Sequence, residues 1–341
     1  MLAAKAYDYL DIRLEELPVP AIGAGEILVR ARACGICSGD VTPWYIRKKA
    51  PIVLGHEPVG EVAAVGPGVE HLALGARVFV HHHVPCFSCP ACDRGEFVQC
   101  ATWRATSLDP GGMAEFFRVP APNVEADTLL LPDSVTDLDG TLIEPLGCVV
   151  KSLRRAGMVH GATVLVIGLG VMGQLHVLLA RYWGAKMVIG ADLRAVRCQK
   201  ALELGADVAV DASTHDVVSA ATEATGGRGC DIVIAGPATT EALDLAIRCA
   251  ARGGTVVQFM GTAPGERYAL DTHDLYFREV RLVPSYSCGP QETREALELI
   301  EAGVVRAHHV VTHRFPLAEV GEAYRTAAQD PSAIKVVVSL T

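Results

Sequence analysis

The sequence predicts an α/β protein in which a doubly wound parallel sheet accompanies a smaller, β-rich domain. Two observations predict this fold class. From about residue 141 onward, short apolar runs alternate with amphipathic helical patterns, and strands that alternate with helices at this spacing form a parallel sheet. The preceding residues are rich in strand and turn signals and carry a cysteine-rich loop. A chain of 341 residues is long enough for two such domains.

The β-rich domain is expected at residues 1–148. EILVRARA at 26–33 alternates apolar with charged side chains, as a half-buried strand does, and Pro and Gly punctuate its surroundings. We expect a small, irregular β-barrel-like domain with the cysteine loop as an excursion. After Pro284, a helical pattern and the strand pattern IKVVVSL predict that residues 285–341 return to this first domain.

The parallel sheet is expected at residues 149–284. Its helices are predicted from the patterns VMGQLHVLLARYWG and RAVRCQKALELG, which separate the apolar runs. The predicted strands are 164–168, 187–191, 207–211, 231–236 and 255–261.

Composition excludes several function classes. The net charge of −9 and the lack of a basic run argue against nucleic-acid binding, which needs clustered Lys and Arg. The first residues meet charges too early for a secretory signal, and the most apolar stretch, 164–180, is broken by Gln, His and Gly, so we expect no membrane association. The chain has eleven cysteines, but with no secretory signal and with metal-like spacing in its cysteine array we expect reduced thiols and a cytoplasmic location.

Four cysteines form a C-x2-C-x2-C-x7-C array in the string CFSCPACDRGEFVQC. Thiolates are soft anionic donors, and four of them close the shell of a tetrahedral Zn²⁺ without an open position. The array therefore predicts a structural zinc, held by Cys86, Cys89, Cys92 and Cys100. After Cys37 is given to a second metal site, most of the remaining thiols are expected to be buried small hydrophobic residues: Cys34, Cys148, Cys198, Cys230, Cys249 and Cys288.

The string GLGVMG at 168–173 predicts a dinucleotide-binding turn, because it follows an apolar strand and opens a helix. Asp192 ends the next strand, where its carboxylate would accept ribose hydroxyls and repel a 2′-phosphate, which favours NAD over NADP. The nearby arginines weaken that preference slightly. The candidate cofactor contacts are Gly168, Gly170, Val171, Met172, Gly173, Asp192, Arg197 and Gly261.

A second, open metal site is predicted upstream of the cysteine array. Cys37 offers a thiolate, His56 an imidazole nitrogen, and Glu57 and Glu144 offer carboxylates. One soft and two harder ligands leave a tetrahedral position for water or an alcohol, which a catalytic zinc requires. The run HHH at 81–83 also offers ligands, but it precedes an already complete zinc loop, so strand-end histidines are the favoured interpretation.

The motifs GHEPVGEVAAVGPGV, the cysteine loop, GGMAEF, IEPLGCVV and VLVIGLGVMG occur in an order that resembles the zinc-dependent medium-chain dehydrogenase/reductase family over essentially the whole chain. The resemblance implies a chaperonin-10-like catalytic domain and a Rossmann domain, with the active site in the cleft between them. It implies that Cys37 and His56 are catalytic-zinc ligands and that Glu57 is the adjacent carboxylate. Glu144 matches the glutamate of the polyol and threonine dehydrogenase branch, and Cys148 is a rival ligand.

One departure from the family concerns the proton relay. The family reads Cys-Gly-Ser/Thr-Asp after its first ligand, whereas this chain reads Cys-Ser-Gly-Asp at 37–40, so Gly39 stands where the relay hydroxyl is expected. Ser38, Thr42, water or the ribose 2′-hydroxyl would have to carry the proton. Asp40 fits a role in orienting a ligand imidazole.

The sequence thus predicts an NAD-dependent, zinc-dependent dehydrogenase with two zinc ions per chain. The predicted substrate is a secondary alcohol, with a polyol or sugar-like molecule as the favoured class. Zinc would act as a Lewis acid and the alcohol would pass a hydride to nicotinamide. A homo-oligomer, dimer or tetramer, is expected. Two alternatives stay open: the same chemistry on an amino-acid alcohol such as threonine, and a relative that binds zinc and nucleotide without catalysis.

Overall fold

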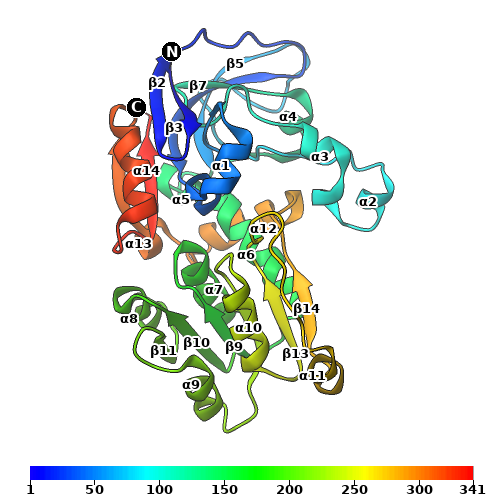
Figure 1. Cartoon of the computed structure of the whole chain (residues 1–341). Coiled ribbons are helices and arrows are strands. Elements are labelled where there is room, and N and C mark those ends of the chain that lie inside the picture. Colours follow the sequence, from blue (N-terminus) through cyan, green and yellow to red (C-terminus); the bar gives the residue numbers. More distant parts are fainter. Residues whose placement is uncertain (341) are drawn as a thin grey trace. The chain divides into compact units, whose positions relative to one another are not determined.

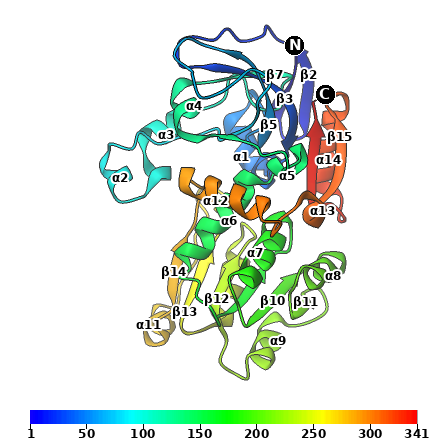
Figure 2. The ribbon, with the colours of Figure 1, turned by 180° about the vertical axis from the view of Figure 1, so that it is seen from behind.

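The computed structural model describes residues 1–340, which form two compact units. Unit 1 comprises residues 1–147 and 288–340, and unit 2 comprises residues 148–287. Unit 1 is therefore built from both ends of the chain, and Figures 1 and 2 show its blue, cyan and red segments. Unit 2 is one uninterrupted stretch, drawn mainly in green and yellow. No helix within the described chain is long and apolar enough to cross a membrane.

Unit 2 contains a parallel sheet of six strands among its described residues, in the order β11-β10-β9-β12-β13-β14. The central strand β9 is buried along its full length, because helices cover both faces of such a sheet. The doubly wound parallel sheet is confirmed. Its strands are β9 (Thr163–Ile167), β10 (Met187–Asp192), β11 (Val208–Asp211), β12 (Cys230–Ala235), β13 (Ala250–Gln258) and β14 (Arg281–Pro284).

The helices of unit 2 pack in two groups. α7 and α8 contact each other and the β9–β11 side of the sheet, and α9 contacts α10, which packs on β12 and β13. The strand order reverses beside β9, and ligands of this fold bind at the carboxyl edge near such a reversal. The helices are α7 (Val171–Tyr182), α8 (Ala195–Glu203), α9 (Val217–Ala224), α10 (Thr240–Cys249) and α11 (Thr272–Arg278).

Unit 1 is built on two sheets. The larger has the order β15-β16-β3-β5-β6-β8 with β7 also paired to β3, and the smaller has the order β2-β1-β4. The strand predicted at 26–33 is β3, with the alternating burial that its sequence pattern indicates. The strands are β1 (Leu2–Asp8), β2 (Asp11–Glu16), β3 (Ile27–Gly35), β4 (Ile52–Val53), β5 (Pro58–Val65), β6 (Arg77–Val80), β7 (Phe116–Val119), β8 (Thr128–Leu130), β15 (Val311–Pro316) and β16 (Lys335–Ser339).

The C-terminal strand β16 pairs antiparallel with β3, so the two ends of the chain share one sheet. This pairing brings Lys335 beside Gly35, where a Cβ would lie 2.9 Å from the lysine Cε. The helices that begin or end in unit 1 are η1 (Ser38–Val41), α1 (Pro43–Lys49), α2 (Pro90–Asp93), η2 (Phe97–Gln99), α3 (Ala101–Ala105), α4 (Ala121–Asp127), α5 (Asp137–Gly140), α6 (Ile143–Arg155), α12 (Pro290–Glu301), α13 (Ala307–Val310), η3 (Leu317–Glu319) and α14 (Val320–Gln329).

Candidate active site and metal centres

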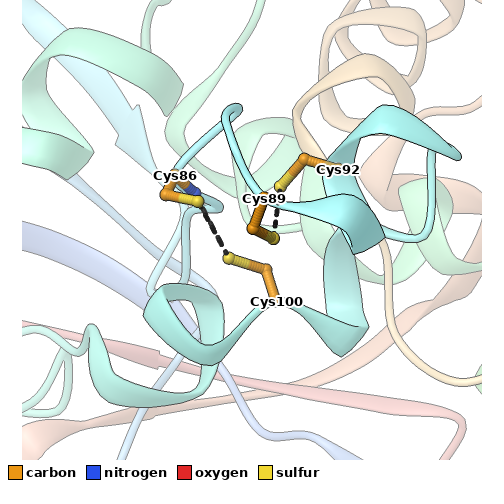
Figure 3. Close-up of side chains that lie close together, drawn as sticks. All are labelled: Cys86, Cys89, Cys92 and Cys100. Atoms are coloured by element: carbon orange, nitrogen blue, oxygen red, sulfur yellow. Dashed lines mark hydrogen bonds between the residues drawn. The ribbon is translucent and has the colours of Figure 1, made fainter.

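The four-cysteine loop brings its thiols together, and Figure 3 shows them pointing toward one another. The Sγ atoms of Cys89 and Cys92 are 3.6 Å apart, as are those of Cys86 and Cys100. A tetrahedral zinc with Zn–S bonds of about 2.3 Å separates its sulfurs by about 3.8 Å. The loop therefore has the dimensions of a zinc shell without any rearrangement of the chain.

The charge balance of this loop also fits a cation. Burial and the neighbouring Cys89 raise the pKa of Cys92 to about 11. Burial opposes ionisation of Cys100, but backbone N–H groups of Cys86 and Trp103 outweigh it and lower its pKa to about 6. Four thiolates this close repel one another, so only a bound cation lets all four ionise together.

The open site forms at the end of β3 and in the turn before β5. Cys37 caps η1, where its Sγ accepts the Gly39 N–H at 3.4 Å. His56 and Glu57 follow Gly55, whose positive φ of 94° and close contact with Met113 N leave no room for a side chain. One ligand atom from each of Cys37, His56 and Glu57 lies within 4.8 Å of the others. The structure thus groups three of the four expected ligands.

Charged neighbours surround these three residues. Asp40 is buried, and its Oδ2 lies 3.5 Å from His56 Nδ1, the position expected of a group that orients the imidazole. Glu57 forms a fully buried ion pair with Lys335, whose Nζ also donates to Ile36 O at 3.0 Å. A lysine from the last strand thus balances the charge of the buried Glu57 carboxylate, which can therefore stay ionised beside the site.

The pKa values follow from these neighbours. Burial lowers the pKa of His56, but the negative charges of Asp40, Cys37 and Glu144 outweigh it and raise the pKa well above its ordinary value. Burial raises the pKa of Glu57, although Lys335 and His56 oppose the effect. The environment of His56 is thus strongly anionic, as a cation site requires.

Glu144 lies in a different group from Cys37. Its carboxylate, the imidazole of His81 and the thiol of Cys288 lie within 4.8 Å of one another, and all three residues are buried. Glu144 still acts on the open site through its charge, which contributes to the pKa values of both His56 and Glu57. Cys148 belongs to none of the three ligand groups found among residues 1–340.

The residues considered for the proton relay have definite positions. Ser38 is exposed, and the Thr42 hydroxyl donates to Ser38 O at 2.9 Å. A Cβ on Gly39 would lie 3.7 Å from Cys37 Sγ and 3.5 Å from the Tyr45 ring, which are ordinary contacts. The position that lacks a hydroxyl is therefore the one that faces the candidate ligand.

In unit 2, the glycine-rich turn has the geometry that a dinucleotide site needs. Gly168 has a φ of 85°, and a Cβ on Gly173 would lie 2.0 Å from Gly168 O, so both positions demand glycine. A Cβ on Gly170 would meet only Arg197 Nη1 at 3.9 Å, so the backbone there is open to close approach. Val171 and Met172 form the first turn of α7, whose N-terminus favours phosphate.

The other expected cofactor residues lie at the carboxyl edge of the same sheet. Asp192 ends β10; its Oδ2 accepts Leu169 N–H at 2.7 Å, and its Oδ1 accepts Arg194 N–H at 3.0 Å. Arg197 Nη1 lies 3.9 Å from the Asp192 carboxylate. Burial and Arg194 lower the pKa of Arg197, while Asp192 opposes them. Gly261 follows β13, and a Cβ added to it would have no neighbour within 4 Å among the described residues. Asp192 thus ends a strand, Arg197 lies in the first turn of the following helix α8, and Gly261 lies in the segment after β13.

Comparison with known proteins identifies the family. Residues 23–130 match the alcohol dehydrogenase GroES-like domain, and residues 171–302 match the zinc-binding dehydrogenase domain. Sorbitol dehydrogenase of Gallus gallus is 33% identical over 93% of this chain and 90% of its own length. L-threonine 3-dehydrogenase of Symbiobacterium thermophilum is 32% identical over 95% and 93%. The chain belongs to the zinc-dependent medium-chain alcohol dehydrogenase family.

A solved relative extends the likeness to three dimensions. A zinc-binding dehydrogenase from Sinorhizobium meliloti 1021, solved with NADP bound, has a TM-score of 0.89 and 30% identity, with 99% of this chain and 98% of that chain covered. This dehydrogenase is therefore an oxidoreductase with zinc and nicotinamide chemistry, built from a GroES-like domain and a Rossmann domain.

Three residues of this dehydrogenase were missed by sequence reasoning. Lys335 pairs with Glu57 from almost the opposite end of the chain, and nothing in IKVVVSL distinguishes it from a strand-edge lysine. His81 lies in the HHH run, which does signal a ligand, and Cys288 is one of the cysteines predicted to be buried small hydrophobic residues.

Proposed function

We propose that this dehydrogenase oxidises a secondary alcohol, a polyol or a sugar-like molecule, and uses NAD as hydride acceptor. The group formed by Cys37, His56 and Glu57 carries the proposal, because its donors suit a zinc ion with an open position. The sorbitol dehydrogenase relatives support a substrate with several hydroxyl groups. A carboxylate-rich zinc environment is also harder than one with two thiolates, which suits oxygen-rich alcohols.

Each residue has a role in holding and tuning this centre. When bound, zinc supplies a Lewis acid that lowers the pKa of an alcohol. Cys37 and His56 would hold it, and Asp40, whose Oδ2 lies 3.5 Å from His56 Nδ1, would orient the imidazole. Glu57 adds a carboxylate whose charge Lys335 balances. Glu144 contributes negative charge near His56 and would reach the zinc through water.

Two zinc ions of different lability would follow from the two centres. The four-cysteine shell offers no open position, whereas the open site leaves one for substrate or a chelator. The free state of all eleven cysteines within residues 1–340 supports a reducing compartment, so we place the enzyme in the cytoplasm. We also propose that the enzyme is a homo-oligomer, either a dimer or a tetramer.

The substrate proton must leave by a route that does not use a side chain at Gly39. Ser38 is exposed, and the hydroxyl proton of Thr42 is donated in a hydrogen bond to Ser38 O. The Thr42 oxygen keeps lone pairs that can accept a proton. We therefore propose that the substrate proton leaves through water, or through Thr42 together with the ribose hydroxyls.

NAD is proposed over NADP because of Asp192. Its carboxylate is fixed by two backbone N–H groups beside the glycine turn, where a ribose 2′-phosphate would meet like charge. Asp192→Ser should lower kcat/KM for NAD by about tenfold or more, since a hydrogen bond to a charged group contributes about 1.5–3 kcal/mol. Asp192→Asn is the matched control, because it keeps an acceptor for Leu169 N–H while losing the charge. A wild-type enzyme that is more efficient with NADP would contradict the assignment.

The decisive experiment follows NADH formation by absorbance with a panel of polyols, simple secondary alcohols and L-threonine. We expect the highest kcat/KM with a polyol. L-threonine as the best substrate would favour the amino-acid alcohol alternative, which the threonine dehydrogenase relative supports. No turnover of any alcohol by a zinc-loaded protein that binds NAD would instead indicate a non-catalytic relative.

A further inference from the structure

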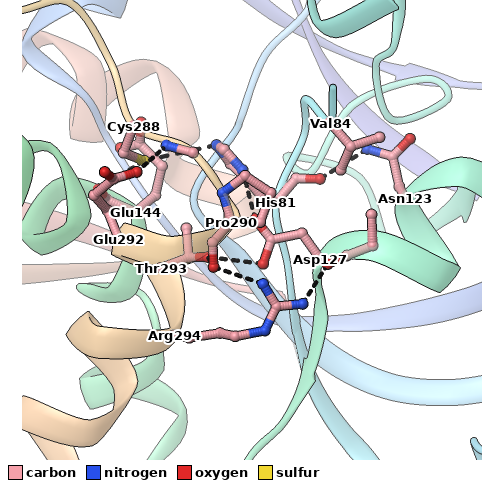
Figure 4. A network of polar contacts seen from close by, with 12 residues as sticks. His81, Val84, Asn123, Asp127, Glu144, Cys288, Pro290, Glu292, Thr293 and Arg294 are labelled. Atoms are coloured by element: carbon pink, nitrogen blue, oxygen red, sulfur yellow. Dashed lines mark hydrogen bonds and ion pairs between the residues drawn. The ribbon is translucent and has the colours of Figure 1, made fainter. Parts of the chain in front are cut away.

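The third ligand group, His81, Glu144 and Cys288, lies in unit 1, and only its Glu144 belongs to a predicted zinc site (Figure 4). His81 directly follows β6, Glu144 lies in the first turn of α6, and Cys288 precedes α12. His81 and Cys288 have no exposed surface, and Glu144 is 5% exposed. Three chemically different metal donors thus converge in the interior from segments far apart in sequence.

Hydrogen bonds fix the orientation of the His81 ring. Its Nδ1 lies 2.8 Å from Asp127 Oδ2, and Asp127 Oδ1 accepts the Thr293 hydroxyl at 2.7 Å. An ionised carboxylate only accepts, so Nδ1 carries a proton and donates it to Asp127. The other nitrogen, Nε2, faces Cys288 Sγ at 3.8 Å and would lose its proton when a cation binds. A carboxylate that holds one nitrogen of a histidine while the other faces a ligand position is the usual support of a metal-binding imidazole.

We propose that His81, Glu144 and Cys288 bind a divalent cation, with Zn²⁺ as the best match. Zn–N and Zn–S bonds of about 2.0 and 2.3 Å place the two ligand atoms about 3.5 Å apart in a tetrahedron, close to the observed separation. Thiolate, imidazole and carboxylate together are the donor mixture that zinc accepts. The negative charges of Cys288 and Glu144 match the two positive charges of the ion, which suits a buried site.

Two contacts surround the sulfur of Cys288. Nε2 of His81 lies 3.8 Å from it, and the Glu144 carbonyl oxygen lies 3.7 Å from it. Without a metal ion, both are long contacts of a thiol; a bound cation would draw the sulfur and the imidazole nitrogen onto one centre. This third site adds to the two zinc centres of the proposed function; it shares Glu144 with the surroundings of the catalytic centre, whereas His81 and Cys288 belong to the third site alone.

Anomalous X-ray diffraction of the wild-type protein tests the proposal most directly. Crystals soaked in ZnCl₂ are measured on both sides of the zinc absorption edge. We expect a peak between His81 Nε2 and Cys288 Sγ, besides the peak inside the four-cysteine loop. A strong peak in the loop with none at His81 and Cys288 would overturn the proposal, and it needs no variant that might fail to fold.

Zinc counts of purified variants provide the second test and separate this site from the catalytic one. Wild type should hold about three zinc ions per chain, and Cys288→Ala and Cys37→Ala about two each. The double variant should hold about one. Cys230→Ala is the control, since Cys230 is equally buried but lies in unit 2 and in no ligand group of the described chain. A Cys288→Ala count equal to that of Cys230→Ala would refute the third site. Loss of zinc in Cys288→Ala but not in Cys37→Ala would refute the proposed catalytic centre instead.

The cobalt-substituted protein adds a signature that a purely structural role for Cys288 would not produce. Thiolate-to-cobalt charge transfer from this site should disappear in Cys288→Ala and persist in Cys230→Ala. An unchanged spectrum in Cys288→Ala would mean that the sulfur binds no metal.

Discussion

The four-cysteine loop and the Cys37–His56–Glu57 site are two metal centres of one unit with opposite construction. The loop draws every ligand from residues 86–100, and its neighbours Val98 and Trp103 are apolar. The open site takes its ligands from two segments and surrounds them with buried charges, Asp40 and Lys335. The first centre takes all the negative charge that holds its ion from its own thiolates, whereas the second depends on partners from distant parts of the chain.

This difference separates a metal that holds a fold from a metal that performs chemistry. A closed shell fixes the positions of its ligands, so its surroundings only have to pack. An open shell must keep its ligands oriented while one position exchanges, so charged neighbours have to fix and tune them. We therefore expect substitutions at the two centres to affect different measurements.

The largest contrast is expected between Cys37→Ala and Cys100→Ala. Cys37→Ala should lower kcat/KM by at least about 10³-fold with little change in Tm, because a Lewis acid supplies several kcal/mol of transition-state stabilisation. Cys100→Ala should lower Tm strongly because it opens the closed shell. Mild chelation should likewise remove activity before the fold is lost. If Cys100→Ala were inactive but fully stable while Cys37→Ala lost stability, the four-cysteine loop would be the catalytic centre and the open site the structural one.

A second test removes the distant partner. Lys335→Met leaves the Glu57 carboxylate buried without its counter-charge, and breaking one side of a buried pair costs about 3–5 kcal/mol. Urea unfolding should register this loss. Lys335→Arg, which keeps the charge, is the matched control and should lose less. If Lys335→Met were as stable as wild type, the idea that the open site depends on the C-terminal strand would be wrong.

Asp40→Asn tests the orientation of His56. The substitution keeps size and removes the charge that lies 3.5 Å from Nδ1. Loss of such a partner typically reduces metal affinity or activity by about 10–100-fold. Competition with a zinc chelator measures the affinity, and Asp137→Asn, in a half-buried cluster with Arg32 and Arg77, serves as the control. Equal zinc affinities of the two variants would show that Asp40 does not orient His56.

The same contrast explains what could be predicted from sequence. The four-cysteine loop could be predicted because its ligands are neighbours in the chain. The doubly wound sheet could be predicted because strand and helix patterns are local. The pairing of Glu57 with Lys335 spans 278 positions, and the contact between His81 and Cys288 spans 207. No local pattern encodes such contacts; they depend on β16 joining β3 and on where α12 packs. The family resemblance named Glu144 but could not show its neighbours.

The smallest effect is expected for Ser38→Ala. Ser38 is exposed and lies one residue before the position that faces Cys37, so its hydroxyl should not serve the substrate. An essential general acid or base contributes about 10²–10⁴-fold, whereas we expect a change of less than about threefold in kcat/KM. Gly39→Ser is the informative partner, because its Cβ fits at ordinary distances from Cys37 Sγ and Tyr45 and places a hydroxyl where relatives carry one. It should retain or raise activity. A loss of kcat/KM by 10²-fold or more in Ser38→Ala, with zinc content and NAD binding intact, would show that η1 turns Ser38 toward the substrate. The open site would then change its local conformation on binding, which the closed four-cysteine loop cannot do.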